Sequence, residues 1–361
     1  MSLDDKINHW IRPEIRELSA YHVPDPGELI KLDAMENPYR WPDAMLESWQ
    51  RQVREIAVNR YPDPAASSLT AALRRSMDIP AGMGVMLGNG SDEIIQILAL
   101  AFGGPKRVVL APEPSFVMYR MIATFSSLEY HGVPLKPDFS LDLAAMLQAI
   151  EQHDPAVVYL AYPNNPTGNL FDEEAIVKIL EAANGVVVVD EAYHAFAGKS
   201  FMPRLGEFDN LLVMRTLSKL GLAGLRLGLI AGPAEWIGEF DKLRLPYNIN
   251  VMTQAAAEFA LDNIEVFDEQ TRLIREERTR LFDEMGRLEG IELFPSAANF
   301  ILFSVPSGRA GEIFESIKAD GVLIKNMKAS EGPLADTLRV TVGAAEENSA
   351  FLAALGKALG S

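Results

Sequence analysis

Short apolar runs alternate with segments of helical periodicity through the middle of the chain. The apolar runs are typical of buried strands and fall at residues 107–111, 157–161, 185–189, 211–214 and 225–231. The segments between them with apolar residues at helical spacing fall at residues 91–102, 141–153 and 172–183. Continuous apolar strands between helices indicate an α/β fold with a mostly parallel sheet that is covered by helices on both faces.

The two ends of the chain follow other patterns. Residues 1–45 are rich in proline and predict an irregular N-terminal arm that packs near the active site. Residues 46–250 contain the alternating pattern and are expected to form a large domain. Residues 251–361 begin with a long charged helical pattern, and strands expected at 298–303, 321–324 and 338–343 then alternate with helices. We therefore expect a smaller C-terminal α/β domain with a connecting long helix.

Composition excludes several classes of function. The net charge of −17 argues against binding to nucleic acid or to an anionic membrane. The chain has no cysteine, and its five histidines form no HxxxH pair, so we expect no metal site. Its first residues do not resemble a signal peptide, and no apolar run approaches the roughly 20 residues needed to span a bilayer. We expect a cytoplasmic protein.

Polar residues with catalytic potential follow the ends of the predicted strands, where ligands bind in parallel sheets. Asn165, Asp190 and Lys219 all lie at or just beyond such ends. Lys219 is surrounded by small and apolar residues, so burial should lower its pKa and free its amine to form an imine with a carbonyl. The alternative is an ordinary lysine whose amine reaches solvent.

A pyridine cofactor with an aldehyde and a phosphate arm would use all of these residues. Asp190 would pair with the ring nitrogen and keep it protonated, while Asn165 and Tyr193 would bind the ring oxygen. Lys219 would form the imine. The phosphate would bind at a glycine-led helix start and at a basic loop, which supply Gly90, Ser91, Asp92, Thr216, Ser218 and Arg226. Taken singly, each is also explained as a turn, capping or packing residue.

The chain resembles a known family at these positions. Residues 163–168, 190–193, 216–219 and 224–226 are similar to the motifs of fold-type-I aminotransferases that depend on pyridoxal 5′-phosphate. The closer resemblance is to histidinol-phosphate aminotransferases, and it extends over nearly the whole chain. The blocks that carry it are residues 36–39, 60–62, 90–93, 298–300 and 338–343. The resemblance implies the fold-type-I architecture, the cofactor and a homodimer.

The resemblance also implies roles for residues that pattern alone does not single out. Tyr119 would stack on the cofactor ring, and Tyr61 would reach the cofactor phosphate of the neighbouring subunit. Arg339 would bind the carboxylate of the amino-acid donor. Tyr21 and Asn37 would line the substrate pocket.

Three positions depart from the family pattern. Phe116 stands where a tyrosine is usual, and Arg226 follows Lys219 by seven positions instead of eight, which calls for a tightened loop. Lys325 replaces an arginine that commonly helps to bind the substrate phosphate. A lysine is a point charge and cannot form a two-pronged contact, although it can still bind phosphate; the alternative is a solvated surface lysine.

The implied reaction exchanges an amino group between L-histidinol phosphate and 2-oxoglutarate, giving imidazole acetol phosphate and glutamate, in histidine biosynthesis. It would proceed by a ping-pong mechanism with Lys219 and Asp190 as the catalytic residues. Two alternatives within the class are an aromatic amino-acid aminotransferase and a decarboxylase of a phosphorylated amino acid. A third alternative is a regulator that binds the cofactor without turnover, but the chain offers no segment for a DNA-binding domain.

Overall fold

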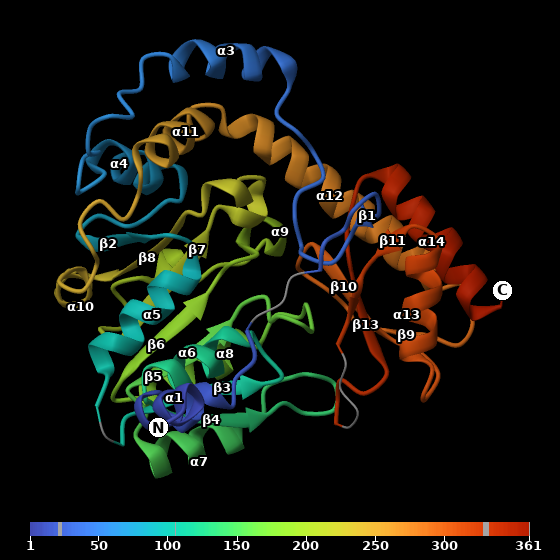
Figure 1. Ribbon diagram of the computed structural model, residues 1–361, viewed down its shortest axis with the longest axis horizontal. Helices are drawn as coiled ribbons and strands as arrows, with labels where there is room; N and C mark the ends of the chain where they lie inside the picture. Colours follow the sequence, from blue (N-terminus) through green and yellow to red (C-terminus); the bar gives the residue numbers. More distant parts are fainter. Residues whose placement is uncertain (21–23, 105, 328–331, 361) are drawn as a thin grey trace.

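The computed structural model describes residues 1–20, 24–104, 106–327 and 332–360, and the strands in these ranges form three sheets (Figure 1). The largest sheet contains, in spatial order, β2 (Met83–Gly88), β8 (Gly228–Pro233), β7 (Leu211–Thr216), β6 (Val186–Asp190), β5 (Val157–Ala161), β3 (Val108–Glu113) and β4 (Glu129–Pro134). Strands β3 to β7 run parallel to one another, whereas β8 is antiparallel to both β7 and β2. The predicted α/β fold with a mostly parallel sheet is therefore confirmed.

The edge strands β2 and β4 were not predicted. The side chains of β4 are mostly polar and partly exposed, and β2 contains glycines, so neither has the continuous apolar run that marks a central strand. Strand β8 begins later than the predicted residue 225, because residues 223–225 form a turn of 3₁₀ helix instead.

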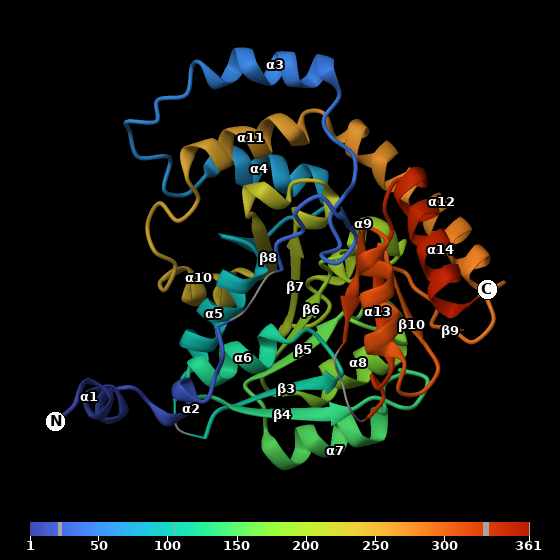
Figure 2. The same cartoon turned by 45° about the vertical axis from the view of Figure 1, so that its right-hand side comes forward.

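Side chains point to alternate faces along the central strands, so the sheet has a separate hydrophobic core on each face. Val186 and Val188 face one side of β6, and Val187 and Val189 face the other, all fully buried. Helices α5 (Ser91–Phe102), α6 (Met118–Phe125) and α10 (Ala234–Asp241) cover the first side, and α4 (Ser67–Ser76), α7 (Leu143–His153) and α8 (Glu173–Ala182) cover the second. Figure 2 shows α5 and α6 on one side of the strands and α8 on the other. Outside α4 lie α11 (Val251–Leu261) and α3 (Asp43–Val53).

The C-terminal part has its own core. The long helix α12 (Ile264–Met285) leads from the large sheet to an antiparallel sheet of β12 (Lys325–Asn326), β13 (Thr337–Thr341), β10 (Phe300–Ser304) and β9 (Glu292–Leu293). Helices α13 (Ala310–Ala319) and α14 (Ala345–Leu359) pack against it around buried Phe300, Phe303 and Phe351. In addition β1 (Ile30–Lys31) pairs with β11 (Val322–Leu323), so the N-terminal segment joins this part of the molecule. The predicted domain limits stay a prediction.

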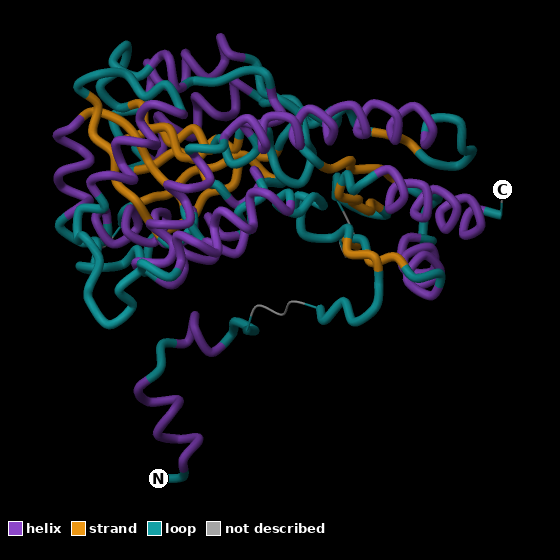
Figure 3. The backbone as a smooth tube through the Cα atoms, turned by 90° about the horizontal axis from the view of Figure 1, so that it is seen from above, coloured by secondary structure: helices purple, strands orange, loops and turns teal. Residues whose placement is uncertain are grey.

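The N-terminal segment is less irregular than predicted. It contains α1 (Leu3–Trp10), which begins with a reciprocal capping box between Ser2 and Asp5, and the short helix α2 (Pro13–Arg16). None of the residues of α1 is buried, and Figure 3 shows this helix standing away from the rest of the chain. Across the described ranges, no helix combines the length and apolar character needed to cross a membrane.

Candidate active site

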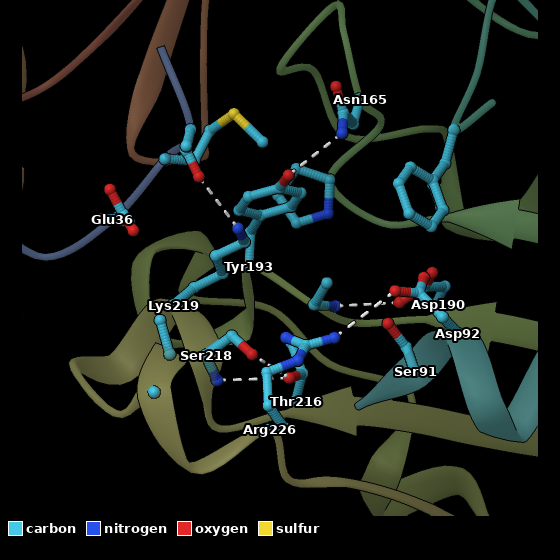
Figure 4. Close-up of a pocket in the computed structure, with 18 residues that line it drawn as sticks. Glu36, Ser91, Asp92, Asn165, Asp190, Tyr193, Thr216, Ser218, Lys219 and Arg226 are labelled. Atoms are coloured by element: carbon cyan, nitrogen blue, oxygen red, sulfur yellow. Dashed lines mark hydrogen bonds and ion pairs between the residues drawn. The ribbon is translucent and has the colours of Figure 1, made fainter. Parts of the chain in front are cut away.

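A cavity of about 410 Å³ opens at the C-terminal ends of β5, β6 and β7 (Figure 4). Its wall consists of these strand ends, the first turn of α5, a crossing segment of residues 34–36, and the loop that follows β7. Parallel register brings the strand ends together, because Ala161 lies opposite Asp190 and Asp190 lies opposite Met214. Residues that are distant in sequence therefore meet at one edge of the sheet, as the positions of the predicted polar residues require.

Lys219 projects into this cavity from a turn of 3₁₀ helix, η2 (Ser218–Leu220), directly after β7. Its Nζ donates a hydrogen bond of 3.1 Å to the carbonyl oxygen of Ala34. Burial and, to a smaller extent, the positive charge of Arg339 lower the pKa of Lys219 to about 8. A minor fraction of this amine, much larger than for an ordinary lysine, is therefore neutral and nucleophilic near neutral pH.

Asp190 ends β6 and presents its carboxylate to the same cavity. Its Oδ2 accepts a 2.7 Å hydrogen bond from the Tyr119 hydroxyl, and its Oδ1 accepts one of 3.1 Å from the Ala192 N–H. Burial raises the pKa of Asp190 to about 6, while these two hydrogen bonds oppose the rise. The group is ionised at neutral pH and suits a cationic partner in the cavity.

Asn165 and Tyr193 line the cavity, and Arg339 lies next to it, hydrogen-bonded to Asn165. The Asn165 amide donates to the Tyr193 hydroxyl at 3.1 Å, and the Arg339 guanidinium donates to the Asn165 carbonyl at 2.6 Å. Arg339 also donates to the carbonyl oxygen of Asp33 at 3.1 Å and lies over the ring of Phe300. Each side chain is buried, so their orientations are held in place.

An anion site lines the same cavity. The first N–H groups of α5 have no partner within the helix, and Gly90 precedes them with φ 80°. Arg226 approaches this turn, and its guanidinium lies 3.5 Å from the carboxylate of Asp92. Thr216 donates to the Ser218 hydroxyl at 2.9 Å, and both side chains line the cavity with Ser91.

Local backbone geometry compensates for the short spacing between Lys219 and Arg226. Two consecutive turns of 3₁₀ helix, η2 and η3 (Ala223–Leu225), tighten the loop, and Arg226 adopts a left-handed conformation with φ 50°. The guanidinium comes so close to Gly90 that an added Cβ there would lie 2.8 Å from it. The positive φ of Gly90 favours glycine at this position, and an added Cβ would in addition make the Arg226 side chain shift.

The cavity fits a cofactor with a phosphate, a cationic ring nitrogen and an aldehyde. The phosphate would meet Arg226 and the start of α5, the ring nitrogen would meet Asp190, and the aldehyde would meet Lys219. Among the described residues, the buried Oδ1 of Asp92 has no hydrogen-bond partner, and this acceptor requires a donor rather than a phosphate oxygen. Asp92 would contribute to phosphate binding through its backbone N–H, because its carboxylate carries the wrong charge.

The structure separates two aromatic residues that the sequence places in one segment. Phe116 lines the cavity. Tyr119, for which ring stacking was predicted, lies behind Asp190 with a fully buried side chain that packs on Tyr159. The ring-stacking role therefore fits Phe116, whose side chain faces the cavity from the loop before α6.

Other predicted residues lie around the cavity rather than in its wall. The Asn37 amide donates to the carbonyl of Leu220 and to Gln270, so it holds the turn that carries Lys219. Lys325 lies on β12, paired in register with Arg339 on β13. Tyr61 is exposed and stacks on Tyr247 with ring centres 4.4 Å apart. Tyr21 lies outside the described residues.

The crossing segment of residues 34–36 was not predicted as part of the site. Its Ala34 carbonyl accepts from Lys219, Met35 has φ 54°, and Glu36 faces the cavity while pairing with Lys31 at 2.5 Å. Residues 36–39 form one of the blocks that resemble the aminotransferase family, so the sequence indicated only the neighbouring region. Only the fold shows that the residues before this block cross over Lys219.

Comparison with known proteins agrees with this geometry. The family model of class I and II aminotransferases matches residues 27–355. Histidinol-phosphate aminotransferase 2 of Nitrosococcus oceani is 58% identical, with 97% of this chain and 98% of that protein covered. Histidinol-phosphate aminotransferase 1 of Ralstonia nicotianae is 52% identical over 99% and 96% of the two chains.

Solved structures show the same fold. The histidinol-phosphate aminotransferase of Sinorhizobium meliloti, solved in complex with pyridoxal 5′-phosphate, superposes with a TM-score of 0.85 at 23% identity over 97% of each chain. The corresponding protein of Clostridium acetobutylicum gives 0.84 at 24% identity, covering 92% of this chain and 99% of its own. With the family model and the curated relatives, these findings place the chain in the class I and II aminotransferase family, among the histidinol-phosphate aminotransferases.

Proposed function

We propose that this chain is a pyridoxal-phosphate-dependent aminotransferase that exchanges the amino group between L-histidinol phosphate and 2-oxoglutarate in histidine biosynthesis. The observation that carries the proposal is one cavity that holds an amine of lowered pKa, a buried carboxylate and an anion site. The high identity to histidinol-phosphate aminotransferases supports the choice of substrates. The cytoplasmic location stays a prediction.

The residues divide the binding of the cofactor among three sets. Gly90, Ser91, Asp92, Thr216, Ser218 and Arg226 would surround the phosphate, Asp190 would pair with the ring nitrogen, and Asn165 and Tyr193 would bind the ring oxygen. Phe116, which lines the cavity, would cover the ring in the role first assigned to Tyr119. Pyridoxal phosphate, when bound, supplies an aldehyde that condenses with amines and an electron-withdrawing ring.

Lys219 has two tasks in this proposal. Its amine would bind the cofactor aldehyde when no donor is present. As a free amine, Nζ would accept the proton from the donor Cα as a general base and return a proton as a general acid. The lowered pKa suits both tasks because the free amine gains and loses a proton readily near neutral pH.

Arg339 would bind the carboxylate of glutamate and 2-oxoglutarate. It is a buried cation next to Lys219 and Asn165, and its planar group can form two parallel hydrogen bonds with a carboxylate. Histidinol phosphate lacks a carboxylate and carries a phosphate instead. Lys325, paired with Arg339 in the neighbouring strand, remains the candidate for that phosphate, and Tyr21 and Asn37 remain candidates for the substrate pocket.

Replacement of Arg339 should therefore affect the two substrate classes unequally. We expect Arg339→Ala to lower kcat/KM for 2-oxoglutarate by roughly 10- to 100-fold, because a hydrogen bond to a charged group is worth about 1.5–3 kcal/mol. Arg339→Lys should recover part of the loss, and Arg272→Ala, which removes an exposed arginine of α12, serves as the control. Steady-state kinetics with each substrate in turn tests this. Unchanged kinetics for 2-oxoglutarate would exclude the carboxylate role.

We also propose that the enzyme is a homodimer with shared active sites. The exposed apolar residues Val58, Tyr61, Leu245 and Tyr247 lie on two segments, which are joined by the stacking of Tyr61 on Tyr247 and by a 3.0 Å hydrogen bond from Arg244 to the Pro64 carbonyl. An exposed apolar patch of this kind is typical of a subunit contact. Tyr61 would reach the partner's cofactor phosphate from this surface.

Mixed dimers test the shared site. We expect a heterodimer of a Tyr61→Ala subunit and a Lys219→Ala subunit to contain one intact site, since the intact Lys219 and the intact Tyr61 then meet across the interface. Its cofactor affinity and activity per intact site should equal those of the wild type, although both parent homodimers are defective. If Tyr61 acts within its own subunit, each site with an intact Lys219 in the heterodimer will have the same cofactor affinity and activity as a site of the Tyr61→Ala homodimer. An active monomer by light scattering would also contradict the proposal.

The choice of substrate is tested by comparing donors. We expect kcat/KM for L-histidinol phosphate to exceed that for L-phenylalanine and for unphosphorylated L-histidinol by roughly 10-fold or more, as expected for one lost charged contact. A preference for phenylalanine would favour an aromatic aminotransferase instead. Release of CO₂ from a phosphorylated amino acid would favour a decarboxylase.

A further inference from the structure

Tyr119 contacts Asp190 but does not line the cavity, so contact with the cofactor does not explain its position. It lies in the first turn of α6, its side chain is 1% exposed, and its hydroxyl donates to Oδ2 of Asp190 at 2.7 Å. Asp190 is itself buried and faces the cavity with its carboxylate. A hydrogen bond to an ionised group in such surroundings is stronger than one between neutral groups.

The ring of Tyr119 is fixed on two sides. It stacks in parallel on Tyr159, with centres 4.5 Å apart and an angle of 6°, and Phe116 meets it edge-on at 5.5 Å. Tyr159 projects from the neighbouring strand β5 and is also fully buried. Packing on both sides therefore aims the Tyr119 hydroxyl at Asp190.

We propose that Tyr119 is a positioning residue that holds Asp190 ionised and correctly oriented, so that the proton shared with the cofactor ring nitrogen stays on the nitrogen. This inference rests on the proposed pairing of Asp190 with that nitrogen. Oδ2 accepts from Tyr119 and Oδ1 from the Ala192 N–H, which leaves lone pairs on the cavity side for the ring. Loss of one donor increases the proton affinity of the carboxylate and draws the shared proton away from the ring.

The charges around Asp190 make this contribution necessary. Burial raises the pKa of Asp190, and the nearby negative charges of Asp92 and Glu191 raise it further. The hydrogen bonds from Tyr119 and from the Ala192 N–H lower it, the former more strongly. The remaining neighbours, Tyr159 and Tyr193, have pKa values raised by burial and stay neutral near pH 7.

The chain offers a matched pair of variants for the test. Tyr119→Phe and Tyr159→Phe each remove one hydroxyl from the same buried stack, but only the first removes a donor to Asp190. With ¹⁵N-labelled pyridoxal phosphate bound, the ¹⁵N chemical shift reports whether the ring nitrogen carries a proton. At neutral pH we expect Tyr119→Phe to move the ¹⁵N shift toward that of an unprotonated ring, because loss of a charged hydrogen bond changes the sharing of the proton between nitrogen and Asp190 by roughly 10-fold. Tyr159→Phe should leave the ¹⁵N shift unchanged.

Cofactor affinity provides a second measurement through a double-mutant cycle with Asp190→Asn. If Tyr119 acts through Asp190, Tyr119→Phe should weaken binding of pyridoxal phosphate roughly 10-fold in the wild type and hardly at all beside Asp190→Asn. Should Tyr119→Phe fail to fold, 3-fluorotyrosine at position 119 keeps the ring and hydroxyl. As a stronger donor, it should move the ¹⁵N shift at neutral pH toward that of a protonated ring, opposite to the effect of Tyr119→Phe.

The outcomes separate this inference from the function on which it rests. Three results would each overturn the role of Tyr119. These are an equal change of the ¹⁵N shift in both phenylalanine variants, no change in Tyr119→Phe, and losses of cofactor affinity that add fully in the double variant with Asp190→Asn. An unchanged nitrogen signal in Asp190→Asn would instead overturn the proposed pairing of Asp190 with the ring.

Discussion

Lys219→Ala should abolish amino transfer. We expect kcat/KM to fall by roughly 10⁴-fold or more, since the variant lacks both the covalent anchor and the general base, and general acid–base catalysis alone contributes about 10²–10⁴-fold. Lys219→Arg should be equally inactive, because a guanidinium keeps the charge but cannot serve as a neutral amine. The exposed Lys242, changed to alanine, is the control. Substantial turnover by Lys219→Ala would contradict the central role of this residue.

The same lysine should give the apoenzyme a characteristic pH profile. Only the neutral amine attacks an aldehyde, and burial lowers the pKa of Lys219 to about 8. The rate at which the apoenzyme captures pyridoxal phosphate covalently should therefore rise with pH up to about 8 and then level off. Stopped-flow absorbance measures this rate. A rate that keeps rising toward the pKa of an ordinary lysine, about 10.4, would show that the amine is not perturbed.

The second large effect is expected for Asp190→Asn. The substitution keeps the shape of the side chain but removes the charge that holds the ring nitrogen protonated, so removal of the donor Cα proton should slow by roughly 10²-fold or more. Asp190→Glu, which keeps the charge on a longer side chain, should be impaired less. Exchange of the Cα hydrogen with deuterium from the solvent measures the step. Exchange at nearly the wild-type rate in Asp190→Asn would exclude the proposed role.

The sequence predicted the residues at the strand ends because their positions follow from only two features, the apolar runs and the parallel direction of the strands. Long apolar runs define the central strands, and parallel strands present their ends at one edge of the sheet. Asn165, Asp190 and Lys219 therefore meet as expected. The strands that the pattern missed, β2 and β4, lie at the edges, where partial exposure removes the apolar signal.

The arrangement of Phe116 and Tyr119 shows what pattern alone does not determine. Both are aromatic and three positions apart, so either could face a cofactor. The helix α6 begins at Met118, which leaves Phe116 in the loop facing the cavity and turns Tyr119 toward the sheet. That boundary follows from tertiary packing, and element boundaries are weakly encoded in a single sequence.

Long-range contacts account for the other residues that the sequence did not identify. Ala34 reaches Lys219 across 185 positions, through a carbonyl group that every residue possesses. No side-chain type marks such a contact. Likewise, the exposure of Tyr61 beside Tyr247 becomes visible only after folding brings residues 58–64 and 243–252 together.

A single-turnover experiment tests the proposed function most directly. Enzyme loaded with pyridoxal phosphate is mixed with ¹⁵N-amino-labelled L-histidinol phosphate in the absence of 2-oxoglutarate, freed of small molecules, and then given 2-oxoglutarate. A ping-pong histidinol-phosphate aminotransferase should release one equivalent of imidazole acetol phosphate per site in the first step and ¹⁵N-glutamate in the second, with neither product from Lys219→Ala. Failure of the first step with histidinol phosphate, while another amino donor supports both, would contradict the proposed function.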